Sequence, residues 1–287
     1  MTPSFSLNLI ADLREMWALP FMLNAFRAGT VVAVLAAPVG WFMVLRRQSF
    51  AGHTLAVVGF PGAAAGVWLG VGATAGYVGF CLAGALVFAL LPRRAPDGGE
   101  RTGAIGTVQA LALASGMVFV ALYHGFLAGT SALLFGSFLG ITAAQVRTLA
   151  VVAAAALAVL AVVARPLLYA SVDADVARAA GVPTRALGLV FLLLLAVTAA
   201  EVGQITGALL VFALLVLPPA TARLLTVRPG RGLLVSVVLA VVTVWVALFV
   251  AYYSPYPLGF WLTTIAFAGH VLAYAGRLVA GTRAAVA

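Results

Sequence analysis

The sequence predicts an all-α integral membrane protein with eight to nine transmembrane helices, some of them broken. Hydrophobic residues make up 64% of its 287 positions, and the mean hydropathy is +1.18. Soluble domains have an apolar share of roughly 45 to 50%. Charged residues are 8% of the chain, and the apolar runs approach the ~20 residues that a helix needs to cross a bilayer. One polar connection, 170–185, predicts a short helix outside the membrane.

The N-terminal residues 1–20 are expected to form a retained segment at the membrane interface. They lack the basic start and the small-residue cleavage site of a signal peptide, and Asp12, Arg14 and Glu15 precede the first apolar run. Residues 21–280 are then the transmembrane domain and 281–287 a cytoplasmic tail. The single cysteine, Cys81, excludes a disulfide or a thiolate metal cluster within one chain.

Nine apolar runs account for the transmembrane domain. In chain order they are 21–45, 54–71, 75–91, 104–126, 146–163, 186–200, 205–217, 233–252 and 257–279. The sixth and seventh runs are short, and four residues are expected to interrupt them: Gly203, Gly207, Pro218 and Pro219. Broken helices in a bilayer lie buried in protein or line a cavity.

The distribution of arginine predicts the orientation of the spans. Arginines cluster at 46–47, 93–101, 165–185, 223–231 and 277–283, which the positive-inside rule places in the cytoplasm. The other connections, around 125–140, 201–206 and 254–257, are poor in arginine and are expected outside. All 16 basic residues are arginine. Because a Walker loop needs a lysine, the chain cannot be its own P-loop ATPase, and its net charge of +9 reflects orientation rather than binding to nucleic acid.

The polar connection predicts a cytoplasmic helix at 172–181. Asp173 can cap it, Asp175 lies in its positive first turn, and Gly181 can take the left-handed closing position. Its apolar side chains are too few to form a core: Val172, Val176 and Ala179 or Ala180. Two interpretations remain open at this point, insertion into a groove on another protein or an ordinary solvated loop helix.

Five segments in order resemble the permease subunits of zinc, manganese and iron uptake ABC transporters. The segments are VLRRQSFAGH (44–53) running to FPG (60–62), TGAIG (102–106), LFGS (134–137), the 172–181 helix with Asp173, Ala177, Arg178 and Gly181, and GALLV (207–211) running to LPPATAR (217–223). Each segment alone is weakly specific, and the resemblance covers about 21–279.

The resemblance implies a homodimeric importer subunit of the type II class in the bacterial cytoplasmic membrane. A dimer of a separate cytoplasmic ATPase would dock on the 172–181 helix, with coupling residues Asp173, Asp175, Ala177, Arg178 and Gly181. An extracytoplasmic metal-binding protein would deliver the cargo. No catalytic residue and no permanently bound cofactor are implied, and zinc is expected before manganese as the transported ion.

The second span departs from the family in the residues that would contact the metal. The family usually carries an aspartate there and a histidine one turn later, which puts two ligands on one helix face. Here these positions read His53 and Val57. One imidazole without a carboxylate makes manganese less suitable and leaves zinc suitable. The alternative for His53 is an interfacial histidine bonded to a backbone carbonyl.

Glu201 is the second candidate for a metal-binding residue. Among the seven acidic residues it alone lies in or beside an apolar run away from the polar loops, where an ionisable group is functional by default. With Gln204 and Thr206 it can form the entrance for metal. The alternative is a hydrated external turn before Gly203.

Three other functions remain for comparison. A type II permease for a chelated metal, such as a siderophore or haem complex, stays open because of the missing aspartate and histidine. A proton-coupled secondary carrier would use Glu201 as a proton relay and the broken helices as its site. An intramembrane enzyme is disfavoured, because the chain has neither an HExxH nor a GxSxG motif.

Overall fold

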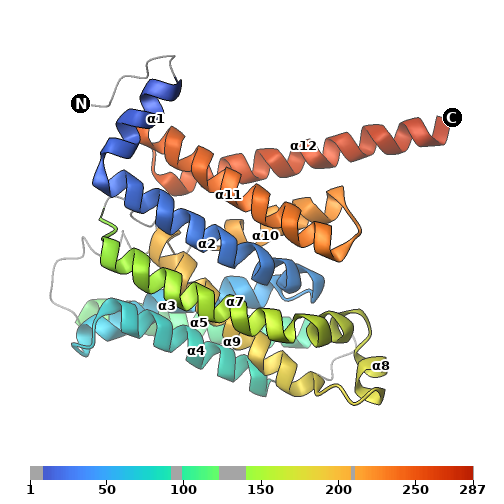
Figure 1. The fold of residues 1–287 in the computed structure, drawn as a ribbon. Helices are drawn as coiled ribbons and strands as arrows, with labels where there is room; N and C mark the ends of the chain where they lie inside the picture. The colour runs from blue at the N-terminus through green and yellow to red at the C-terminus, as the bar shows by residue number, and fades with distance from the viewer. Residues whose placement is uncertain (1–8, 92–98, 123–139, 208–210, 287) are drawn as a thin grey trace.

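The computed structural model describes residues 9–91, 99–122, 140–207 and 211–286, and throughout these ranges the regular structure is helical (Figure 1). The helices are α1 (Leu9–Ala18), α2 (Pro20–Leu45), α3 (Ser49–Trp68), α4 (Ala73–Leu90), α5 (Gly99–Leu122), α7 (Ala143–Val172), α8 (Ala174–Ala179), α9 (Thr184–Thr206), α10 (Val211–Leu225), α11 (Pro229–Tyr253) and α12 (Leu258–Val286). Eight of the described helices are long and apolar enough to cross a membrane, and α10 is shorter. The predicted fold class is confirmed.

The long helices run alongside one another, with α1 and α8 at opposite ends of the bundle (Figure 1). α3 lies at the centre, packed against α4, α5 and α9. In its most apolar window 83% of the residues are buried, against 11% in α5. α3 is therefore the span most enclosed by its own chain, while α5 presents most of its surface outward.

Several helices begin or end at residues other than those predicted. α7 continues well past the apolar run 146–163, through Pro166, to Val172, so that Val172 closes α7 and does not belong to the short helix. The N-terminal segment contains α1, whose Met16 is buried while Trp17 is exposed. Residues 281–286, predicted as a tail, continue α12 as helix. The segment LFGS (134–137) and the connection 123–139 lie outside the described residues.

The predicted break at Gly203 is wrong. α9 is continuous to Thr206 and ends at Gly207, whose φ of 84° closes the helix. Gly203 instead accommodates Tyr77 of α4, because a Cβ at residue 203 would collide with the Tyr77 hydroxyl. Tyr77 is 1% exposed and donates a hydrogen bond to the Ala56 carbonyl of α3 at 2.9 Å. This tyrosine thus joins three spans at one point.

The predicted break at Pro218 and Pro219 is also wrong, since both prolines lie inside α10. A proline cannot donate to the carbonyl four residues earlier, which for Pro219 is the carbonyl of Leu215. Gly40 of α2 packs directly against that carbonyl and against the Pro219 ring, where a Cβ would collide. The helix continues because it is buried against α2, and loosened backbone is tolerated in a membrane where protein covers it.

Candidate functional site

His53 lies on the enclosed helix α3, one turn after its start at Ser49. Its ring packs edge-on against Phe212 of α10, with the ring centroids 5.3 Å apart. Its Nδ1 atom is buried and makes no hydrogen bond within the described part of the chain. The interfacial interpretation requires a backbone carbonyl as the hydrogen-bond partner of the ring, and the described residues supply none at this nitrogen. An imidazole nitrogen without a hydrogen-bond partner can bind a metal ion.

The residues around His53 are neutral. Thr54 is fully buried and donates a hydrogen bond to Oε1 of Gln109 on α5 at 2.9 Å. Val57, one turn after His53, is buried and apolar. No three His, Cys, Asp or Glu side chains come together anywhere in the described ranges. The described residues of one chain therefore do not form a complete metal site at His53.

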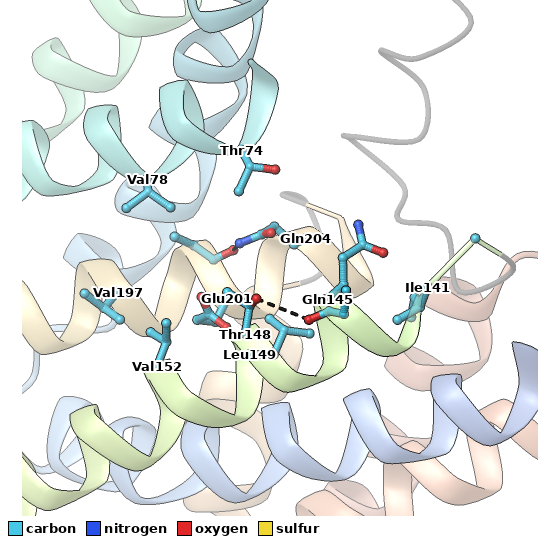
Figure 2. A pocket seen from close by; sticks show the side chains of 13 residues that line it. Thr74, Val78, Ile141, Gln145, Thr148, Leu149, Val152, Val197, Glu201 and Gln204 are labelled. Carbon is cyan, nitrogen blue, oxygen red and sulfur yellow. Dashed lines mark hydrogen bonds between the residues drawn. The ribbon is translucent and has the colours of Figure 1, made fainter. Parts of the chain in front are cut away.

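Glu201 lines a cavity of about 630 Å³ between α4, α7 and α9 (Figure 2). The residue is 6% exposed, and its Oε2 atom is buried without a hydrogen-bond partner among the described residues. Other polar side chains share the cavity wall: Thr74, Gln145, Thr148 and Gln204. Gln204 and Thr148 each donate to a carbonyl of their own helix, Ala200 and Ala144, at 3.2 Å. Glu201 thus lies inside α9 and not in the predicted hydrated turn.

The two candidate metal-binding residues lie on neighbouring helices, α3 and α9, which contact each other. A Cβ on Gly52, the residue before His53, would be 3.6 Å from the side chain of Leu195 on α9. Leu195 precedes Glu201 by six residues, which is ~9 Å along a helix. His53 does not line the cavity that contains Glu201, so the two side chains do not share that cavity.

The short helix α8 forms as the local sequence predicts. The Asp173 carboxylate accepts hydrogen bonds from the backbone N–H groups of Asp175 at 3.0 Å and Val176 at 2.9 Å. Asp175 pairs with Arg178. Gly181 has a φ of 81°, and the next amide, Val182, donates to the Ala177 carbonyl at 2.9 Å. Both ends of this one short helix are therefore closed by its own residues.

Only one of the predicted coupling residues faces the bundle. Ala177 is fully buried, whereas Asp173, Asp175, Arg178 and Gly181 are exposed. The apolar residues Val172 and Val176 are 76% and 50% exposed. α8 therefore rests on α7 and α9 through Ala177 and turns an apolar and a charged surface outward.

Arg46, at the end of α2, supports the base of α8 from a distant part of the chain. Its guanidinium donates a hydrogen bond to Oγ of Ser171 at 3.0 Å and lies over the Phe191 ring of α9, 5.4 Å from the centroid. The distribution of arginine along the sequence predicts only that Arg46 lies on the cytoplasmic side. No sequence signal links it to Ser171, because the partners are 125 residues apart.

A family model described as the ABC 3 transport family matches residues 18–276. The chain belongs to the ABC 3 transport family. The manganese transport system membrane protein MntC of Listeria innocua is 25% identical over 239 residues, covering 81% of this chain and 82% of that protein. The high-affinity zinc uptake system membrane protein ZnuB of Haemophilus influenzae is 26% identical over 199 residues, covering 69% and 76%.

The fold also has a counterpart of known structure. PsaBC from Streptococcus pneumoniae, solved in complex with a Fab, superposes with a TM-score of 0.83 and 23% identity, covering 93% of this chain and 95% of that chain. The family and the fold together make this protein a multi-pass, non-catalytic permease subunit of a bacterial ABC transporter, which works with a separate ATPase and a binding protein.

Proposed function

We propose that this permease imports a divalent first-row transition metal, with zinc preferred to manganese. The carrying observation is His53, an imidazole on the enclosed helix α3 whose buried Nδ1 lacks a partner. Imidazole suits zinc, whereas manganese prefers oxygen ligands, and the residue one turn after His53 is the apolar Val57. The named relatives do not discriminate, since a manganese and a zinc protein are about equally similar.

The proposed route leads from Glu201 on α9 to His53 on the neighbouring helix α3. The buried carboxylate of Glu201 attracts a dication that enters the cavity between α4, α7 and α9. A single carboxylate and a single imidazole bind a metal weakly, which favours passage over storage. A homodimer would bring two copies of His53 to one pathway, and the described residues of one chain, which form no cluster of three such ligands, support that assembly.

The proposed coupling element is α8. ATP-driven movement of a docked ATPase subunit pushes on a short helix whose ends are closed and whose base is tied to α2 by Arg46. A helix fixed in this way transmits displacement as a rigid body. The exposed Val172 and Val176 supply the apolar surface that docking in a groove requires.

The test is uptake of radiolabelled zinc and manganese by cells that depend on this transporter. Three variants are compared with the wild type: His53→Ala, His53→Asp, and His53→Asp combined with Val57→His. We expect His53→Ala to lose zinc uptake by at least about tenfold, which corresponds to ~1.4 kcal/mol of binding. Both aspartate variants should shift uptake toward manganese, because they restore an oxygen ligand.

The matched control is Val57→Ala, which changes the same helix face without removing a ligand. Equal zinc uptake in His53→Ala and the wild type would remove His53 from the route. Uptake of a siderophore or haem complex without free-metal uptake would establish the chelated-metal alternative. Transport that survives ATP depletion and collapses with a protonophore would establish the secondary carrier.

A further inference from the structure

Three arginines line a pocket of about 370 Å³ at the cytoplasmic end of α10, α11 and α12. Arg228 occupies the position just before α11, Arg231 lies in the first turn of α11, and Arg277 comes from α12. The two helices thus place three full positive charges around one hollow. The route for metal described above uses none of these residues.

Among the described residues these charges have no acidic partner. From residue 202 to the end of the sequence there are five arginines and not a single Asp or Glu. The ion pair found in the described ranges, Asp175 with Arg178, belongs to α8. The C-terminus of α10 contributes a partial negative charge of about half a unit, which is small against three guanidinium groups. The pocket is therefore suited to an anion.

The side chains that border the pocket are suited to lipid. Leu225, the last residue of α10, is 56% exposed, and Val227, in the connection to α11, is 95% exposed. Around Arg277 the surface of α12 is apolar as well, with Tyr274 and Leu278 both more than half exposed. Arg277 lies at the end of the candidate span Leu258–Val279, and Arg231 lies at the start of the span Pro229–Tyr253. The arginines are thus at the level of the inner-leaflet headgroups, between side chains that face acyl chains.

We propose that this pocket binds the phosphate of an anionic phospholipid of the inner leaflet, such as phosphatidylglycerol. Guanidinium groups match phosphate oxygens in a bidentate geometry, and basic pockets between helices on the cytoplasmic side bind acidic headgroups. A general electrostatic attraction to anionic lipid would involve every arginine at this end of the bundle. The proposal is more specific, because it places the lipid phosphate at the three arginines that line the pocket.

The experiment uses the full permease purified with its ATPase. Retained phosphatidylglycerol is measured by native mass spectrometry, and thermal unfolding is measured in nanodiscs of phosphatidylcholine with increasing phosphatidylglycerol. The variants are Arg228→Gln, Arg231→Gln, Arg277→Gln and the triple variant. Arg223→Gln is the matched control, because Arg223 is an exposed arginine of the same helix end that does not line the pocket.

We expect each single variant to bind phosphatidylglycerol about fivefold more weakly and the triple variant to lose the preference over phosphatidylcholine, while Arg223→Gln behaves like the wild type. The single variants keep the test valid if the triple variant does not fold. The proposal is overturned if Arg223→Gln lowers binding as much as a pocket variant, or if the pocket variants retain the lipid fully. Stabilisation by inorganic phosphate alone, or loss of the ATPase with unchanged lipid binding, would assign the pocket to a different ligand.

Discussion

The hydroxyl group of Tyr77 occupies the space that a side chain at Gly203 would fill. α4 and α9 therefore meet at this point with only the tyrosine ring between their backbones. The same ring lies against Gly59 of α3, and its hydroxyl donates to the Ala56 carbonyl. Glu201 is two residues from this contact, so the packing of Tyr77 fixes the part of α9 that lines the cavity between α4, α7 and α9.

Gly203→Ala is expected to destabilise the protein by about 1 to 3 kcal/mol, the usual range for overpacking. The tyrosine cannot move aside without losing its hydrogen bond or striking Gly59. Thermal unfolding in detergent measures the effect. Gly269→Ala is the matched control, since Gly269 lies in a helix with no atom near its missing Cβ.

Tyr77→Phe should relieve part of the collision in Gly203→Ala, because it removes the oxygen that the new methyl group meets first, while the ring carbon Cζ stays 2.8 Å away. The double variant is then more stable than the sum of the two single effects predicts, which is the signature of residues in contact. Strict additivity of the two unfolding free energies would show that Tyr77 and Gly203 do not touch.

Asp173→Ala is expected to impair coupling without preventing insertion of the protein. Loss of an N-cap costs about 0.5 to 2 kcal/mol, and a helix as short as α8 has little stability of its own. Uptake and permease-stimulated ATP hydrolysis should both fall. Asp173→Asn is the control, because asparagine caps equally well. If both variants transport at the wild-type rate, the order of α8 does not matter for coupling.

Glu201→Gln is expected to lower metal uptake by about tenfold, or ~1.4 kcal/mol, and to leave the unfolding temperature unchanged or raised. An amide is less costly to bury than an unpaired carboxylate. This opposite change in transport and stability separates a binding role from a structural one. Gln204→Ala, in the wall of the same cavity, should retain most uptake. Reduced stability with normal uptake in Glu201→Gln would contradict the binding role.

Arg46→Gln should lower stability by about 1 to 2 kcal/mol, since a half-buried charged donor to Ser171 is lost, and should reduce coupling as well. Arg47→Gln, next to it and exposed, changes the same cytoplasmic charge without breaking that contact. Comparison of ATP hydrolysis per metal transported in the two variants measures the coupling. Equal ratios in the two variants would show that the contact between Arg46 and Ser171 does not contribute to coupling.

The sequence by itself determined the long apolar helices and α8, because each depends on residues that are neighbours along the chain. Apolar runs of sufficient length form helices in a bilayer whatever surrounds them. Asp173 and Gly181 close α8 through bonds to atoms a few residues away.

The continuity of α9 and α10 was decided by tertiary structure alone. Gly203 is explained by Tyr77 and Pro219 by Gly40, and these contacts join residues more than a hundred positions apart. The placement of His53 outside the cavity of Glu201 and the convergence of Arg228, Arg231 and Arg277 have the same cause. Each depends on where helices lie relative to one another, and local periodicity carries no information about that.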